Sequence, residues 1–374
     1  MRRNRRPFLA ALAGVVTTAG LGAWAPPSLG DGDWPAGPLT EAGFVPDLGE
    51  QIDAGVRSGR FENLHGVLIA RDGKLVLERY YEGEDEIRGR PRGRVPFDAN
   101  TLHDLRSVTK SIVGLLYGIA RAQGVVPPLD APLVDQFPEY PDLAADPLRR
   151  RMTVAHALSM TLGTEWDEGL SYRDPRNSEH AMGLAGDRYR FVLDRPMVTA
   201  PGTQWVYNGG ATTVLGRLIA KGSGRSLRAY AEEKLFAPLG ITALHWLRGR
   251  DGEYIAASGL RLRPRDLAKI GQLVLNGGRW HGRQIVPAAW LARSFRRHAT
   301  TGELDYGYHG WLDPQPTGRP RWVAAFGNGG QRLTVVPGLN LIVVITAGNY
   351  NRPDDWKLPV AIITEVIIPG MQRE

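Results

Sequence analysis

The sequence of 374 residues predicts an α+β fold, in which an antiparallel β-sheet is flanked by helices and carries an inserted, mostly helical lobe. β-Rich runs occur near both ends of the chain, at residues 65–80 and 321–347, whereas apolar residues between them recur with helical spacing. We therefore expect a discontinuous sheet domain of residues 46–100 and 246–374, a helical domain of residues 101–245, and an active site in the cleft between the two.

The first β-rich segment predicts a hairpin. Residues 65–71 and 74–80 are rich in β-branched and other apolar residues, and they flank the dipeptide Asp72-Gly73, which is typical of a two-residue hairpin turn. The mixed charges of residues 82–94 then indicate a solvated surface loop.

The C-terminal third of the chain supplies the rest of the predicted sheet and two helices. Residues 321–326, 331–336 and 340–347 have the composition of strands, and Pro337-Gly338 provides a turn between the last two. Residues 264–276 and 354–367 show helical patterns.

The N-terminus predicts a secretory signal in residues 1–25. Four arginines precede an apolar run, Phe8 to Trp24, that is too short for an ordinary membrane span. Asn4-Arg5-Arg6-Pro7-Phe8-Leu9 resembles the twin-arginine export signal of bacteria. We expect recognition by the export machinery, a periplasmic or extracellular mature protein without a stable membrane span, and a linker rich in Pro and Gly at residues 26–45. An uncleaved anchor is the alternative.

Composition excludes several classes of function. The 46 basic residues exceed the 39 acidic ones by seven, but without the four N-terminal arginines 42 remain, a formal net charge of +3, so nucleic acid is not implied as a partner. The absence of cysteine excludes disulfides, thiolate metal sites and a cysteine nucleophile. The eight histidines lack His-Glu-x-x-His or another paired spacing for zinc, so neither a metal nor another cofactor is expected.

A helix with a polar pair in its first turn is the strongest indication of chemistry. Ser107 and Lys110 are three residues apart and therefore share a face of this helix. A neutral lysine amine could take the serine proton, and burial lowers the pKa of a lysine toward that neutral form. The alternative is that Ser107 only caps the helix and Lys110 is solvated, but a cation is unfavourable in the first turn. The helix is indicated by apolar residues at helical spacing: Val108, Ile112, Leu115, Leu116 and Ile119.

Three further segments carry polar residues beside Gly-rich or aromatic stretches. The turn Pro201-Gly202 leads to Tyr207 at the start of a helix, which makes Tyr207 a candidate proton carrier. Asn328-Gly329-Gly330 directly precedes a predicted strand. Tyr172-Arg173-Asp174-Pro175 forms an aromatic, charged loop.

Together these motifs resemble the serine β-lactamase and penicillin-binding-protein superfamily, in particular its class C β-lactamase branch with related esterases, D-aminopeptidases and 6-aminohexanoate-dimer hydrolases. Ser107 and Lys110 match the Ser-x-x-Lys motif. Tyr207 matches the Tyr of Tyr-x-Asn, although Gly209 stands in place of the Asn. Asn328-Gly329-Gly330 resembles the Lys-Thr-Gly motif, with a neutral residue in place of the cation.

The resemblance implies a role for each matched residue. Ser107 would form an acyl-enzyme, and Lys110 and Tyr207 would act as its acid and base. The backbone N–H groups of Ser107 and Gln331 would form the oxyanion hole. The residues expected to bind substrate are Asn328, Gly329, Gly330, Tyr172, Asp174 and Asn208.

The expected substrate is a carboxylic ester or a linear amide, because neutral Asn328 offers no full charge to the carboxylate of a β-lactam. A β-lactamase or an enzyme like the D-Ala-D-Ala carboxypeptidases is the alternative, and a catalytically inactive binding protein is the alternative of a different class. A Ser-His-Asp hydrolase is disfavoured because the chain contains no Gly-x-Ser-x-Gly.

Overall fold

The computed structural model describes residues 34–315 and 318–372. The chain forms two compact units. Of the described residues, unit 1 comprises 34–103, 262–283 and 321–372, and unit 2 comprises 104–261, 284–315 and 318–320. Unit 1 contains an antiparallel sheet flanked by helices and unit 2 is mostly helical, so the predicted α+β class is confirmed.

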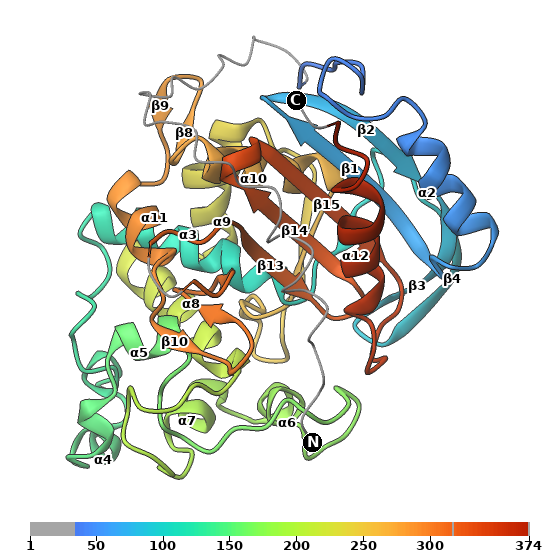
Figure 1. Cartoon of the computed structure of the whole chain (residues 1–374). Coiled ribbons are helices and arrows are strands. Elements are labelled where there is room, and N and C mark those ends of the chain that lie inside the picture. The colour runs from blue at the N-terminus through green and yellow to red at the C-terminus, as the bar shows by residue number, and fades with distance from the viewer. Residues whose placement is uncertain (1–33, 316–317, 373–374) are drawn as a thin grey trace. The chain divides into compact units, whose positions relative to one another are not determined.

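The sheet of unit 1 joins the two ends of the chain. Its strand order is β13-β14-β15-β1-β2, with antiparallel pairing throughout. Figure 1 shows the red strand β15 beside the blue strand β1, and Ile69 pairs with Val343 in that ladder. The predicted hairpin and the three predicted C-terminal strands are confirmed: β1 is Leu64–Arg71, β2 Lys74–Tyr80, β13 Val323–Gly327, β14 Gln331–Val336 and β15 Leu341–Ala347.

Helices cover this sheet because its strands are apolar on both faces. Every residue of β15 is buried. Helix α10 (Pro264–Leu275) packs against β14 and β15, and a Cβ added at its Gly271 would lie 2.9 Å from Leu333 and from Ile342. In Figure 1, α12 (Lys357–Ala361) lies in front of the strands and continues as a π-helix, Ile362–Ile367. Helix α2 (Leu48–Arg57) packs against that π-helix.

Residues 82–96 form a second hairpin rather than the predicted loop, although strand β4 is almost fully exposed, as the mixed charges indicate. Strands β3 (Glu82–Ile87) and β4 (Arg90–Pro96) pair antiparallel, with a register shift between Asp85 and Glu86. Both of these acidic side chains are buried. Charged residues are usually exposed, but Asp85 can be buried because Arg92 pairs with it across the hairpin. The Nη1 of Arg92 lies 3.0 Å from Oδ2 of Asp85.

The segment of residues 34–45 is also ordered, in contrast to the predicted linker. The indole N–H of Trp34 donates to the carbonyl of Gly73 at 2.8 Å, and Ala36 forms a bridge with Leu75. Phe44 is fully buried and forms a bridge with Met371. Trp34 and Phe44 therefore anchor this segment in the core of unit 1, while most of the residues between them are partly or fully exposed. The predicted signal peptide lies outside the described residues, and within the described part of the chain no helix has the length and apolar character to cross a membrane.

Unit 2 is organised around the packing of two long helices, α3 (Val108–Ala122) and α8 (Gly209–Ser223). The remaining helices are α4 (Pro141–Ala144), α5 (Val154–Ser159), α6 (Ser178–Leu184), α7 (Arg188–Leu193), α9 (Leu227–Ala231), a π-helix (Glu232–Phe236) and α11 (Ala288–Ser294). Short strands are β6 (Leu244–Trp246), β10 (Ala299–Thr300), β11 (Asp305–Tyr306) and β12 (Trp311–Leu312), while β5 (His103–Asp104), β7 (Leu260–Leu262), β8 (Arg279–Trp280) and β9 (Arg283–Gln284) lie at or near the unit boundaries.

The predicted domain limit at residue 246 differs from the division of the structure, because residues 246–261, 284–315 and 318–320 group with the helices of unit 2. The indole N–H of Trp290 donates to the carbonyl of Gly114 in α3, at 3.1 Å. Ser111, also in α3, donates its hydroxyl to the carbonyl of His309. Side chains of the 284–320 segment therefore help to bury α3, which the pattern of strands and helices along the chain does not reveal.

Candidate active site

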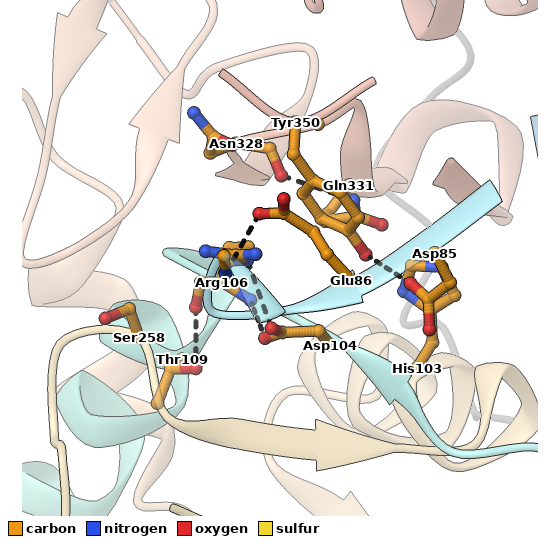
Figure 2. Close-up of polar contacts among 12 residues, drawn as sticks. Asp85, Glu86, His103, Asp104, Arg106, Thr109, Ser258, Asn328, Gln331 and Tyr350 are labelled. Carbon is orange, nitrogen blue, oxygen red and sulfur yellow. Dashed lines mark hydrogen bonds and ion pairs between the residues drawn. The ribbon is translucent and has the colours of Figure 1, made fainter. Parts of the chain in front are cut away.

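The predicted nucleophile stands at the start of α3. Ser107 is the residue immediately before the helix, and its own backbone is helical. The residue before it, Arg106, has a positive φ of 48°, which non-glycine residues rarely adopt. The Nε of Arg106 lies 3.1 Å from Oδ2 of Asp104, an interaction drawn in Figure 2. This turn fixes the direction in which Ser107 enters the helix.

Ser107 and Lys110 meet as their spacing predicts. The Lys110 ammonium donates a hydrogen bond to Ser107 Oγ at 3.0 Å and another to the carbonyl of Ala257 at 3.0 Å. Lys110 is only 2% exposed, and its Nζ lies 3.5 Å from a carboxylate oxygen of Glu179.

The protonation of Lys110 differs from the expectation that burial would yield a neutral amine. Burial does act to lower the pKa of Lys110, but Tyr207, Glu179 and Glu168 outweigh it and raise the pKa above its ordinary value. The site therefore favours the ammonium form of Lys110.

Tyr207 lies in the same cluster. The Lys110 Nζ is 5.0 Å from the centroid of the Tyr207 ring, and the ring stacks on Trp311 at 5.9 Å. Burial raises the pKa of Tyr207, whereas Lys110 and a hydrogen bond with Ser107 act in the opposite direction. The three residues proposed for proton transfer are thus brought together within unit 2, as the motifs predict.

Two acidic residues that the sequence analysis did not identify complete this cluster. Glu168 accepts hydrogen bonds from the indole of Trp166 at 2.7 Å and from the hydroxyl of Tyr172 at 2.9 Å. Glu179, in α6, accepts from the hydroxyl of Ser258 at 2.7 Å. Burial and the neighbouring Glu179 raise the pKa of Glu168, because two carboxylates in one buried site cannot both ionise easily.

The departure from the Tyr-x-Asn motif explains how these acids fit. The backbone N–H of Gly209 donates to Glu168 Oε1 at 2.5 Å. A Cβ at Gly209 would lie 2.6 Å from Glu179 Oε2 and 3.1 Å from Glu168 Oε1. The space that an Asn side chain would need therefore holds two carboxyl groups. The sequence carried one indication that other side chains enter this site, because glycine in place of the motif Asn leaves space that they can fill.

Two residues expected to bind substrate have other contacts. Asn208 is buried and caps α8, where its Oδ1 accepts from the backbone N–H of Ala211 at 2.9 Å. Asp174 forms a bidentate pair with Arg176, which lowers the pKa of Asp174 to about 2. Tyr172 does reach the cluster, through its hydrogen bond to Glu168.

The Asn328-Gly329-Gly330 segment belongs to unit 1. Oδ1 of Asn328 accepts from the backbone N–H of Asn351 at 3.0 Å. Gly329 and Gly330 have φ values of +92° and +95°, which L-residues with side chains rarely adopt. The side chain of Gln331 donates to the carbonyl of Ala347 at 2.6 Å, which holds the start of β14. The oxyanion hole formed by Ser107 and Gln331 combines residues of the two units and stays a prediction.

Comparison with known proteins identifies the family. Residues 55–362 match the family model described as Beta-lactamase. The chain belongs to the beta-lactamase family. It is similar to esterase EstB of Burkholderia gladioli, with 28% identity over 54% of this chain and 52% of EstB, so the match spans about half of that relative's length.

Two further relatives cover more of the chain. The 6-aminohexanoate-dimer hydrolase of Paenarthrobacter ureafaciens is 23% identical over 80% of this chain and 74% of that enzyme. The solved structure of an octameric penicillin-binding protein homologue from Pyrococcus abyssi superimposes with a TM-score of 0.65 at 20% identity, covering 87% of this chain and 77% of that one. The structural similarity supports the fold assigned above.

Proposed function

We propose that this member of the beta-lactamase family is a serine hydrolase that cleaves carboxylic esters or linear amides through an acyl-enzyme on Ser107. The observation that carries the proposal is the 3.0 Å hydrogen bond between the buried side chains of Lys110 and Ser107, Nζ to Oγ, beside the partly exposed Tyr207. A serine hydroxyl needs a neighbour that accepts its proton and a charge that stabilises the resulting alkoxide. Tyr207 and Lys110 supply these two functions.

The surroundings of Lys110 and Tyr207 favour different roles for these two residues. Because Lys110 is held as an ammonium by Glu179, Tyr207 is the better proton acceptor in its phenolate form, which the adjacent cation stabilises. Ser107 transfers its proton to Tyr207 and attacks the carbonyl carbon. Tyr207 then gives this proton to the leaving alcohol or amine. In the second half-reaction water gives a proton to Tyr207 and attacks the acyl carbon, and Ser107 recovers a proton as the acid departs.

The remaining roles follow from backbone geometry. The N–H of Ser107 at the start of α3, with the N–H of Gln331, is proposed to bind the oxyanion. Asn328, Gly329 and Gly330 are proposed to line the substrate, since the two glycines allow a chain to approach β14 closely.

The charges around Lys110 support esters and linear amides over β-lactams. Glu179 offsets the positive charge of Lys110, and Asn328 is neutral, so an anionic substrate finds little attraction at these positions. The names of two relatives, an esterase and a 6-aminohexanoate-dimer hydrolase, are consistent with this choice. Hydrolysis of β-lactams or D-Ala-D-Ala peptides and binding without catalysis are the alternative outcomes.

Steady-state assays on p-nitrophenyl butyrate, 6-aminohexanoate dimer and a chromogenic cephalosporin test the proposal. We expect a higher kcat/KM for the ester or the linear amide than for the cephalosporin. Ser107→Ala should lose on the order of 10⁴-fold in turnover. Ser58→Ala, at an exposed serine of unit 1, is the matched control and should keep full activity. A cephalosporin kcat/KM above both others would contradict the assigned substrate class, and turnover by none of the three would favour a binding protein.

We also propose export through the twin-arginine pathway, from the sequence of Arg5 and Arg6. Replacing both by Lys should leave the precursor in the cytoplasm, as followed by cell fractionation. Unchanged export of this double variant would refute the pathway and leave the hydrolase proposal untouched.

A further inference from the structure

Three potential metal ligands converge inside unit 1, on residues that the proposed reaction does not use. They are His65 in β1, Asp85 in β3 and His103 in β5. One ring nitrogen of each histidine and one carboxylate oxygen of Asp85 all lie within 4.8 Å of one another. Figure 2 shows Asp85 beside His103. All three residues are at most 5% exposed. We propose that His65, Asp85 and His103 form a binding site for a divalent transition metal of the zinc type.

The neighbours of His65 fix which of its nitrogens faces the cluster. The side-chain oxygen of Asn63 accepts a hydrogen bond from the backbone N–H of Glu84 at 2.8 Å, which identifies it as the oxygen, Oδ1, of the amide. The same oxygen lies 3.3 Å from His65 Nε2, so Nε2 carries the proton and donates it. Nδ1 of His65 therefore presents a lone pair toward Nε2 of His103, 2.8 Å away.

This orientation is the one that metal-binding histidines adopt. A ligating histidine commonly donates its second N–H to a carbonyl or carboxylate oxygen, which holds the ring and its tautomer in place. Asn63 has that role here, and its own amide N–H donates to the carbonyl of Glu84 at 3.0 Å.

Glycines in the surrounding backbone leave room for the ring of His65. A Cβ at Gly83 would lie 2.6 Å from Nε2 of His65, and a Cβ at Gly348 would lie 2.6 Å from Cε1 of the same ring. Phe97 stacks on His65 with the ring centroids 4.0 Å apart. The pocket is therefore fitted to His65 from several directions.

The strand pairings that contain His65 and Asp85 are both irregular at these residues. The pairing of β1 with β15 shifts register between Leu64 and Gly66, the position of His65. The pairing of β3 with β4 shifts between Asp85 and Glu86. Irregularities of this kind turn a side chain away from the regular alternation and are common near functional sites.

Asp85 already accepts hydrogen bonds from two neighbouring side chains. Nη1 of Arg92 donates to its Oδ2 at 3.0 Å, and the hydroxyl of Tyr350 donates to its Oδ1 at 3.1 Å, the contact drawn in Figure 2. Metal ligands are commonly held by such second contacts. Two imidazoles and one carboxylate form a ligand set that zinc accepts, with water completing four-coordination.

Binding requires only a small movement of the two rings. Zinc–nitrogen bonds of about 2.0–2.1 Å in a tetrahedral site place two ligand nitrogens roughly 3.3 Å apart. The present separation of 2.8 Å therefore has to widen by about half an ångström. The proton that His103 Nε2 now donates to His65 Nδ1 must move to Nδ1 of His103 or to solvent, since a ligand nitrogen presents its lone pair to the metal.

Metal titration of the untagged protein, after removal of metals with a chelator, tests the site. We expect one equivalent of Zn²⁺ by isothermal titration calorimetry and a Zn²⁺-dependent rise of Tm, since a ligand that binds the folded state stabilises it. His103→Gln and Asp85→Asn should each weaken binding at least about tenfold. His281→Gln, at an exposed histidine outside the cluster, is the matched control and should bind as the wild type does.

Cobalt gives a second readout that needs no variant. Co²⁺ bound by two imidazoles, a carboxylate and water should show the intense ligand-field absorption of low coordination numbers, and Zn²⁺ should displace it. Equal zinc affinity in the wild type and His103→Gln, or no such absorption in the wild type, would overturn the proposal. The Ser107→Ala variant should retain the full metal site, so the test is independent of the proposed hydrolase activity.

Discussion

The Nζ of Lys110 lies 3.5 Å from a carboxylate oxygen of Glu179, and both side chains are almost completely buried. An ion pair removed from water holds its charges strongly, because losing either charge leaves the other without compensation. This pair makes Lys110 a fixed cation beside Ser107, and it assigns the exchange of protons to Tyr207.

The activity should therefore rise with pH. Burial raises the pKa of Tyr207, so the phenolate is a minor form at neutral pH and its population grows toward alkaline pH. We expect kcat/KM on p-nitrophenyl butyrate to increase by up to about tenfold per pH unit between roughly pH 6 and 9, as measured in buffers of constant ionic strength. A profile that is flat or that falls over this range would exclude Tyr207 as the base.

Removing the charge of Glu179 should shift that profile. Glu179→Gln retains an acceptor for Ser258 but no longer raises the pKa of Lys110, so the Lys110–Tyr207 pair loses its proton at lower pH. The rising limb of kcat/KM should move to lower pH by about one unit, equivalent to about 1.4 kcal/mol. Glu165→Gln, at an exposed carboxyl paired with Arg195, is the control and should leave the profile in place. An identical profile for Glu179→Gln would show that this carboxylate does not set the protonation of the pair.

Restoring the Asn of the family motif should destabilise this protein. The side chain in Gly209→Asn would collide with the carboxyl groups of Glu179 and Glu168, so we expect a loss of about 1–3 kcal/mol in the free energy of unfolding measured with denaturant. Gly183→Ala is the control, because a Cβ there meets nothing within 4 Å and α6 should tolerate it.

A second substitution tests whether the loss of stability in Gly209→Asn comes from collision with Glu168. Gly209→Asn combined with Glu168→Ala should recover part of the lost stability, since contacting residues are not additive in a double-mutant cycle. Strictly additive losses would mean that Glu168 does not occupy the space of the missing Asn.

His309 should lower the free energy of unfolding as the pH falls. Burial and the neighbouring Lys110 lower the pKa of His309 to about 3, against an ordinary value of 6.5. Below pH 6.5 the unfolded chain gains a proton that the folded site refuses, so the stabilisation present above pH 6.5 is lost progressively down to about pH 3. The slope of the unfolding free energy should be up to roughly 1.4 kcal/mol per pH unit for this residue.

Denaturant unfolding at several pH values measures that slope. His309→Gln should be less stable at pH 7, since it loses hydrogen bonds with Thr212 and the carbonyl of Leu158, but its stability should fall less steeply below pH 6.5. His245→Gln, at an exposed position, should keep the wild-type slope. Equal slopes for His309→Gln and the wild type would contradict the burial of a neutral ring.

Local patterns predicted the parts of this protein that local physics determines. Asp72-Gly73 between two β-branched runs is enough to define the β1–β2 hairpin, and the three-residue spacing of Ser107 and Lys110 places them on one face of α3. Neither depends on a distant partner.

Features that depend on distant partners could not be predicted in this way. The mixed charges of residues 82–94 predicted a solvated loop. The pairing of β3 with β4 brings Arg92 to Asp85, and the sequence alone does not reveal this contact. Glu168 and Glu179 belong to no motif, and only the folded unit shows that they fill the space at Gly209. Asn208 stands one residue from a motif position, yet its side chain caps α8. The proposed metal ligands are 20 and 18 residues apart in sequence, His65 to Asp85 and Asp85 to His103, and come from three strands, so no short spacing marks them.

The most direct test of the central claim is the mass of the protein after treatment with a fluorophosphonate. An activated serine should react once, and peptide mapping should place the adduct on Ser107. The adduct should be absent from Ser107→Ala and retained in Ser58→Ala. A single adduct on Ser107 is the predicted result, whereas an adduct on another residue, or none in a folded wild-type protein, would contradict the assignment of Ser107 as the nucleophile.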